Sequence, residues 1–281
     1  MVNPGTVTEG QSVRLTCSTT CTLTGSPAFI WYRDGSPLSF TDQSHLFTAS
    51  SEDAGRYSCA VKGYELQSPA VALNVRYPPK SISVSVSCSD EIVEGSSVTL
   101  TCMNNANPPV QRYAWFKKTG SAFSWRGSEW SYTIKNITLQ DVGEYTCQAE
   151  NVIGTNRSPP KCLDVQYSPK NISVSVSPSG EIVEGSSVTL TCSSDANPPV
   201  QNYIWYRRTG STFQWRGSKW SYTINTFTLQ DVGKYYCEAQ NRFGAKKSPP
   251  KHLNVQCEYI SASLLQTHRA ESQCLWETSQ Q

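Results

Sequence analysis

Cysteine is the residue type whose number and spacing in this chain most clearly allow chemistry, and that chemistry is disulfide formation. Eleven cysteines occur among 281 residues, a content that favours an oxidising compartment over the cytosol. Six of them form three similarly spaced pairs, each with a tryptophan 13 or 14 residues after its first cysteine. We expect disulfides that join Cys17 to Cys59, Cys102 to Cys147, and Cys192 to Cys237.

The sequence does not contain the residue patterns needed for metal binding, catalysis or phosphate binding. The histidines His45, His252 and His268 are scattered, and no cysteine–histidine cluster has metal-ligand spacing. No nucleophile, base and orienting group can be placed together, and no glycine-rich phosphate loop occurs. A net charge of +2 with 16% charged residues gives no footprint for nucleic acid or a membrane surface, and no apolar run is long enough to span a bilayer. We therefore expect no enzyme, cofactor, metal, nucleic-acid partner or direct membrane insertion.

Three copies of one unit must position these cysteines. The string EIVEGSSVTLTC occurs at 91–102 and again at 181–192, and a divergent copy, VTEGQSVRLTC, occupies 7–17. Each copy consists of short alternating segments separated by Gly, Pro, Asn and Ser, which predicts strands and turns. Within the second copy Val98, Leu100 and Cys102 share one face, as in a half-buried antiparallel strand.

The order of cysteine, tryptophan and Tyr-x-Cys in every copy is typical of an immunoglobulin sandwich. In that fold the disulfide bridges two sheets, the tryptophan packs on it, and the tyrosine forms a corner. The expected core tryptophans are Trp31, Trp115 and Trp205, and the expected corner tyrosines are Tyr57, Tyr145 and Tyr235. The sequence thus predicts an all-β chain of three tandem immunoglobulin-like β-sandwiches of the short constant-like or intermediate set.

The joints between the copies are short and contain proline. YPPK at 77–80 and YSPK at 167–170 predict domains at 1–77, 78–167 and 168–256 with little swing between them, and hence a semi-rigid rod. Residues 257–281 show neither strand nor helix periodicity and are expected to be an irregular, disordered tail. Because the chain opens without an apolar signal region, we interpret it as a piece of a longer precursor.

The strings VEGSSVTLTCSSDANPPVQNYIWYRRTG and LQDVGKYYCEAQNRFG resemble immunoglobulin-superfamily receptors, above all the stalk of the B-cell inhibitory branch of the sialic-acid-binding immunoglobulin-like lectin (Siglec) family. The resemblance covers about residues 1–256, although hemicentin-like, Fc-receptor-like and adhesion modules share many of these strings. It implies a cell-surface or secreted protein whose partners are cell-surface proteins or glycoproteins. The arginine that holds sialic acid in the family is absent, because Ala60 and Val61, Gln148 and Glu238 follow the three Tyr-x-Cys motifs.

The pairing of the remaining five cysteines is less well determined by the sequence. By the resemblance, Cys21 is half of a bridge to a missing N-terminal domain; the alternative is a free or intermolecular thiol. Cys88 and Cys162 occur only in the middle copy, on its first and last strands, and a second bridge between them is plausible. Cys257 and Cys274 could close the tail.

Three sequons predict glycosylation at Asn136, Asn156 and Asn171 if the chain is exported. Asn156 is the weakest of them because Pro159 follows its serine.

The motif SWRGSEW, at 124–130, returns as QWRGSKW at 214–220. Trp130, Tyr132 and Ile134 alternate like a strand and are expected in the core, as are Trp220, Tyr222 and Ile224. Arg126 and Arg216 could pair with Asp141 and Asp231, whereas the first copy has no arginine between Asp34 and Ser51 to pair with Asp53. Trp125 and Trp215 remain as candidate surface contacts.

We therefore expect an extracellular segment of a Siglec-like immune receptor that acts mainly as a spacer for a distal ligand-binding domain. A direct protein-binding adhesion module and a secreted soluble or decoy isoform are the alternatives. An intracellular muscle-type immunoglobulin array is disfavoured by the extra cysteines and the sequons.

Overall fold

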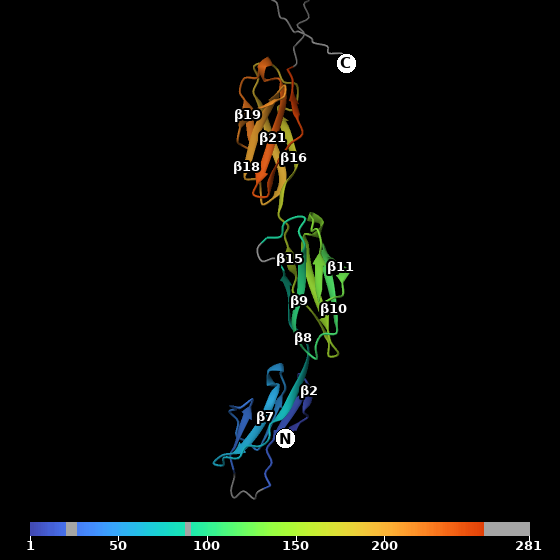
Figure 1. Cartoon of the computed structure of the whole chain (residues 1–281), viewed down its shortest axis with the longest axis vertical. Helices are drawn as coiled ribbons and strands as arrows, with labels where there is room; N and C mark the ends of the chain where they lie inside the picture. The colour runs from blue at the N-terminus through green and yellow to red at the C-terminus, as the bar shows by residue number, and fades with distance from the viewer. Residues whose placement is uncertain (21–26, 88–90, 256–281) are drawn as a thin grey trace, which may run out of the picture. The chain divides into compact units, whose positions relative to one another are not determined.

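The computed structural model describes residues 1–20, 27–87 and 91–255. Cys21, Cys88, Cys257, Cys274 and the tail at 257–281 lie outside the described residues. The chain is all-β and divides into two compact units, Met1–Tyr167 and Ser168–Gln281. The first unit holds two sandwiches and the second unit holds one (Figure 1).

The first sandwich packs a three-stranded sheet against a second sheet that continues beyond it. The three-stranded sheet is ordered β1 (Val2–Asn3), β3 (Ser12–Thr16), β6 (Ser44–Thr48). The facing sheet is ordered β5 (Ser36–Pro37), β4 (Phe29–Arg33), β7 (Gly55–Val61), β8 (Val71–Val86), with β2 (Thr6–Thr8) parallel to β8.

The second sandwich begins on the same strand, because the far half of β8 pairs with β9. Its first layer is β8, β9 (Val98–Asn107) and β12 (Ser131–Ile134). Its second layer is β11 (Ala122–Gly127), β10 (Arg112–Thr119), β13 (Gly143–Glu150) and β14 (Thr155–Arg157), with β15 (Lys161–Leu163) also on β13.

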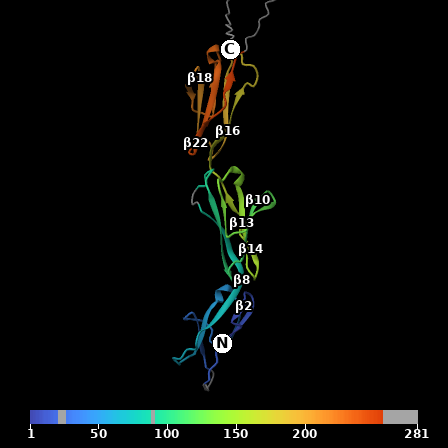
Figure 2. The same ribbon diagram turned by 45° about the vertical axis from the view of Figure 1, so that its right-hand side comes forward.

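The third sandwich repeats this plan (Figure 2). One layer is β16 (Tyr167–Ser177), β17 (Val188–Asn197) and β20 (Ser221–Ile224). The other layer is β19 (Thr212–Gly217), β18 (Asn202–Thr209), β21 (Gly233–Asn241) and β22 (Gly244–Lys247), with β23 (Lys251–Leu253) on β21.

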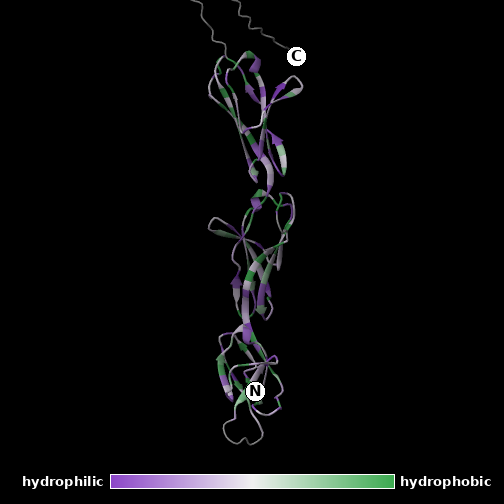
Figure 3. Cartoon of the chain, turned by 90° about the vertical axis from the view of Figure 1, so that its left-hand side faces the viewer, coloured by the Kyte–Doolittle hydropathy of each residue, from purple (hydrophilic) through white to green (hydrophobic). Residues whose placement is uncertain are grey.

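The alternation expected from the sequence builds three separate cores. On β9, Val98, Leu100 and Cys102 are buried, while the residues between them are only partly covered. Figure 3 shows apolar and polar residues interspersed along the strands. One apolar cluster fills each sandwich, and the fully buried side chains of each cluster include its expected core tryptophan.

The disulfides lie inside these cores. They join Cys17 to Cys59, Cys102 to Cys147, and Cys192 to Cys237, with Cα atoms 6.2, 6.0 and 6.2 Å apart. Since each bond connects the two opposite layers, it holds the two sheets of its sandwich together.

A tyrosine corner precedes the second cysteine of every sandwich. The hydroxyls of Tyr57, Tyr145 and Tyr235 donate to the carbonyls of Asp53, Asp141 and Asp231 at 2.8, 3.0 and 2.8 Å. The three aspartates end short 3₁₀ turns, η1 (Ser51–Asp53), η2 (Leu139–Asp141) and η3 (Leu229–Asp231), each with a capping box. Burial raises the pKa of all three tyrosines, that of Tyr235 to about 12.

The pairing that the sequence allowed, of Arg126 with Asp141 and of Arg216 with Asp231, does not occur: among the described residues neither arginine forms an ion pair with its corner aspartate. The cation at the corner comes instead from the strand that carries the core tryptophan. In the first sandwich this cation is Arg33, which lies 3.6 Å from Asp53. The equivalent residues Lys117 and Arg207 donate to the carbonyls of Gln140 and Val232. The first sandwich therefore has an arginine for Asp53 after all: it is Arg33, which directly precedes the segment from Asp34 to Ser51.

Candidate functional site

The joint between the first two sandwiches is one continuous strand. Near its start, β8 pairs with β7 of the first sandwich, Leu73 lying opposite Gly55. Near its end, β8 pairs with β9 of the second sandwich, Val86 lying opposite Leu100. A strand that is hydrogen-bonded at both ends restricts bending between the sandwiches more than a free linker does.

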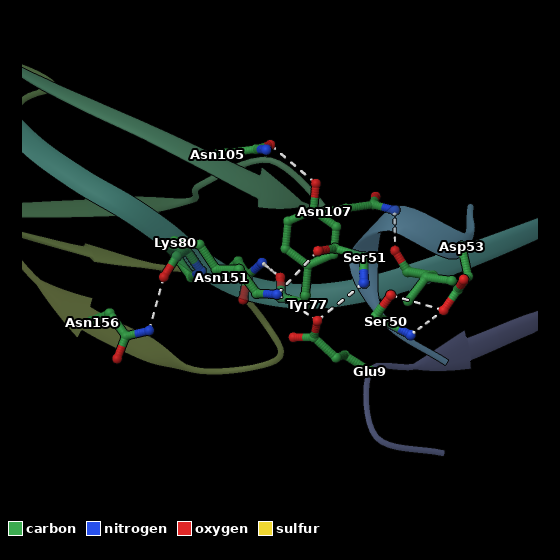
Figure 4. Close-up of polar contacts among 12 residues, drawn as sticks. Glu9, Ser50, Ser51, Asp53, Tyr77, Lys80, Asn105, Asn107, Asn151 and Asn156 are labelled. Carbon is green, nitrogen blue, oxygen red and sulfur yellow. Dashed lines mark hydrogen bonds and ion pairs between the residues drawn. The ribbon is translucent and has the colours of Figure 1, made fainter. Parts of the chain in front are cut away.

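An ion pair ties the second half of β8 back to the first sandwich. The ammonium of Lys80 contacts the carboxylate of Glu9 and lies 3.1 Å from the Ser51 hydroxyl. The backbone N–H of Ser51 also donates to Glu9, at 3.0 Å (Figure 4). Glu9 therefore accepts from both sides of the joint, and the Lys80 hydrogen bond holds its pKa below the ordinary value.

Asparagine amides make most of the remaining contacts across the joint. The Asn107 amide, at the end of β9, donates to the Asn74 side chain at 2.8 Å and to the Val75 carbonyl at 2.7 Å. The Tyr77 hydroxyl donates to the Asn105 side chain at 3.0 Å. These bonds hold the end of β9 against the last residues of the first sandwich (Figure 4).

Asn151 is the most buried amide of the joint, with 4% of its surface exposed. Its nitrogen donates to the carbonyls of Tyr77 and Pro108 at 2.9 and 2.8 Å. Its oxygen accepts from the N–H groups of Ile153 and Gly154 at 2.9 and 3.1 Å. One side chain thus fixes the β13–β14 turn, the Pro108 loop and strand β8 together.

Acid should weaken this joint through Glu9. Because its pKa is lowered in the folded chain, its contribution to stability is present above the pKa of the unfolded chain and is lost as pH falls through the folded pKa. We expect Glu9→Gln to reduce the loss of thermal stability between about pH 5 and pH 3, an effect below about 1 kcal/mol for a pair this accessible. The measurement is the melting temperature against pH, with exposed Glu65→Gln as the control. An unchanged pH profile in Glu9→Gln would exclude this role.

The three predicted glycosylation sites lie in different surroundings. Asn136, Asn156 and Asn171 are all exposed. The Asn156 amide nitrogen, however, donates to the Pro79 carbonyl of the joint at 2.8 Å. The Asn171 amide bonds to the exposed Asp195 carboxylate at 2.9 Å. A glycan on Asn156 must attach to a nitrogen that donates to the backbone of β8 within the joint, whereas the Asn171 nitrogen donates only to an exposed side chain, which can turn away.

We therefore expect glycans on Asn136 and Asn171 and an unmodified Asn156 when the chain is secreted from mammalian cells. Glycopeptide mass spectrometry measures the occupancy of all three sites in one sample. Substantial occupancy of Asn156 would contradict the contact with Pro79 as a lasting feature of the joint.

The repeated tryptophan motif is mostly surface. Trp125 and Trp215 are 63% and 65% exposed, as befits candidate contacts. The expectation that Trp130 and Trp220 belong to the core is wrong, since they are 59% and 60% exposed. Both precede the strands β12 and β20, which begin one residue later, so the alternation does not reach them.

Cys162 is exposed on β15, opposite Glu144 in register. β8, which ends two residues before Cys88, and β15 lie in opposite layers of the second sandwich, and the isolated parallel bridge between Val93 and Gln166 joins residues outside both strands. Val86 and Cys162 nevertheless line the same hollow, which is compatible with the predicted Cys88–Cys162 bond. Because Cys88 lies outside the described residues, that bond stays a prediction.

In the described part of the chain no group of three or more His, Cys, Asp or Glu side chains is placed to hold a metal ion. The same residues include no helix long and apolar enough to cross a membrane.

Comparison with known proteins places the chain in a family. Two profiles described as immunoglobulin domain match it, one at residues 1–75 and 171–255 and the other at residues 78–151. Mouse B-cell receptor CD22 is 32% identical over 253 residues, which is 89% of this chain and 28% of CD22. Rat limbic system-associated membrane protein is 32% identical over 202 residues, 68% of this chain and 57% of the relative. Rat myelin-associated glycoprotein is 30% identical over 212 residues, 73% of this chain and 32% of the relative.

The chain thus spans less than two thirds of the length of each of these relatives. The crystal structure of the mouse nectin-like molecule 4 ectodomain, with three immunoglobulin domains, has the same fold at a TM-score of 0.52. It is 22% identical and covers 93% of this chain and 99% of that one. Both matching profiles are of immunoglobulin domains, and the relatives are named as a receptor, a membrane protein and a glycoprotein, none of them as an enzyme. The expected resemblance is confirmed: the chain belongs to the immunoglobulin-domain superfamily and is homologous to CD22 and myelin-associated glycoprotein.

Proposed function

We propose that this chain is an extracellular segment of a Siglec-like adhesion or recognition receptor and acts mainly as a spacer for a distal ligand-binding domain. The observation that supports a spacer most directly is the joint, where one strand and a set of polar contacts connect two sandwiches. A module that must hold a binding domain away from a surface needs such restrained joints more than it needs a pocket of its own.

The proposed domain limits are 1–77, 78–167 and 168–256. Three separate cores and the ranges matched by the two immunoglobulin profiles support them. The proposed partners are cell-surface proteins or glycoproteins, by analogy with relatives whose names describe a receptor, a membrane protein and a glycoprotein.

A direct adhesion module is the second candidate, and the exposed Trp125 and Trp215 favour it. The positions that follow the Tyr-x-Cys motifs offer no arginine for sialic acid, so neither function uses that ligand in the family's manner.

A cell-binding experiment separates these functions. The recombinant chain, clustered on streptavidin, is applied to immune cells with and without sialidase treatment, in the presence of excess soluble heparin so that contacts with cell-surface polyanions do not contribute. A spacer gives no binding in either case. Binding that sialidase leaves intact and Trp125→Ser with Trp215→Ser removes would support the adhesion module. Binding that sialidase abolishes would refute both.

A further inference from the structure

A like-charged pair lies on the outer face of one sheet of the third sandwich. Arg208 on β18 is directly opposite Lys234 on β21, and His252 on β23 is opposite Lys234 on its other side. All three side chains are exposed. Like charges directly opposite each other in an antiparallel pair are destabilising, so the arrangement has a cost that the fold itself does not require.

The second sandwich provides an internal comparison for this pair. There the same two positions are Lys118 and Glu144, which form an ion pair at 2.8 Å. The position of His252 is taken by Cys162. The backbone pairing is the same in the two sandwiches. The second sandwich has an ion pair at these positions, whereas the third has two adjacent cations.

An aromatic cluster continues this face beside the cations. The Phe213 ring lies 5.2 Å from Tyr236 and 6.3 Å from Tyr206 between centroids. The Lys247 ammonium lies 4.8 Å from the centre of the Tyr206 ring and 4.9 Å from that of Phe213. Only Glu238 offers an opposing charge to Lys247 among the described residues, and it lies 3.5 Å from it.

The charge of the whole third sandwich points the same way. Residues 168–255 contain ten lysines and arginines against five aspartates and glutamates, whereas residues 78–167 contain eight of each. The near-neutral total of the chain, +2, therefore conceals a strongly basic third sandwich.

We propose that this basic face, defined by Arg208, Lys234, Lys247 and His252, binds a sulfated polysaccharide of the glycosaminoglycan type. Directly opposite residues such as Arg208 and Lys234 stand about 5 Å apart, and Lys247 lies further along the same face, in register with Glu238. A linear polyanion that follows the face can therefore contact all of them. The exposed rings of Phe213 and Trp215 present flat apolar surfaces on which the C–H faces of sugar rings can stack. This activity goes beyond a spacer, because it would anchor the segment to the cell-surface glycan layer.

The test measures binding of the whole recombinant chain to immobilised heparin over a range of salt concentrations. The expected result is binding that weakens steeply as salt rises, as for other polyanion contacts. Chemically desulfated heparin should not bind. Double-stranded DNA and polyglutamate should bind more weakly than heparin. The proposal would be overturned if heparin did not bind. It would also be overturned if desulfated heparin, DNA or polyglutamate bound as tightly as heparin.

Variants assign the binding to this face. Lys234→Glu rebuilds the pair that Lys118 and Glu144 form in the second sandwich, so it should keep the fold and weaken heparin binding about tenfold. Lys62→Glu makes the same charge change at an exposed site of the first sandwich. It should alter heparin binding by less than about twofold. Glu144→Lys places two cations opposite each other beside Arg157 and Phe123 in the second sandwich, as in the third, so it should create a second such face and strengthen binding. Equal losses in Lys234→Glu and Lys62→Glu, with unchanged melting temperatures, would show only a net-charge effect and refute the site.

Discussion

Replacing Trp205 with alanine should destabilise the third sandwich by about 3–5 kcal/mol, whereas Trp215→Ala should cost less than about 1 kcal/mol. The two residues are ten positions apart in one sandwich, but Trp205 is fully buried and Trp215 is 65% exposed. The Trp205 indole N–H also donates to the Lys219 carbonyl at 2.9 Å, a bond that alanine cannot make. The loss combines a cavity with an unpaired carbonyl.

Hydrogen exchange of β17 and β21 measures this effect within the third sandwich while the other two sandwiches serve as internal references. Trp220→Ala is a second control, because that side chain is 60% exposed. If Trp215→Ala or Trp220→Ala lowered protection as much as Trp205→Ala, the division of these tryptophans into core and surface would be wrong.

The fold could be predicted from the sequence because its requirements are local and repeated. A buried disulfide needs a cysteine on each layer, the tryptophan must follow at a fixed spacing, and the corner tyrosine must precede the second cysteine. These requirements recur in three copies, so the two-layer architecture was predictable from side-chain type and period alone.

At Trp130 the two-residue alternation of a strand does not predict whether the side chain is buried. This tryptophan continues the alternation of Tyr132 and Ile134, but β12 begins at Ser131, and Trp130 lies in the bend before it. Its carbonyl still accepts from the Cys102 N–H at 3.0 Å, as a strand residue would. The side chain nevertheless projects into solvent, because alternation fixes direction only within a regular strand.

The short, proline-containing joint was predicted, but its side-chain contacts were not, because the residues that make them are distant in sequence. Asn156 bonds to a carbonyl 77 residues away, and Asn107 to one 32 residues away. Asparagine in a turn is ordinary, so its type carries no signal. One signal was present: Asn151 recurs as Asn241, which likewise donates to a proline carbonyl, that of Pro198 at 3.0 Å.

Asn151→Ala should therefore destabilise the second sandwich by about 2–4 kcal/mol, since it removes four hydrogen bonds worth roughly 1 kcal/mol each. It leaves two carbonyls and two N–H groups without their partner at a position that is 4% exposed. Because two of those bonds hold β8 and the Pro108 loop, the first and second sandwiches should also unfold less cooperatively. Differential scanning calorimetry should show the unfolding transition of the second sandwich at a lower temperature than in the unmodified chain. That transition should also be separated from the transition of the first sandwich.

Two further variants show that the amide, and not merely its volume, is responsible. Asn156→Ala removes an exposed amide with a single bond to the same strand, so it should cost less than about 1 kcal/mol. Asn151→Asp keeps the shape and both accepted bonds, but places a carboxylate against the carbonyl oxygens of Tyr77 and Pro108. It should be worse than alanine at neutral pH and should recover as acid protonates the carboxylate, because the protonated acid can donate one of the two bonds again. An Asn151→Asp variant as stable as the original chain at pH 7 would show that the two donated bonds do not hold the joint.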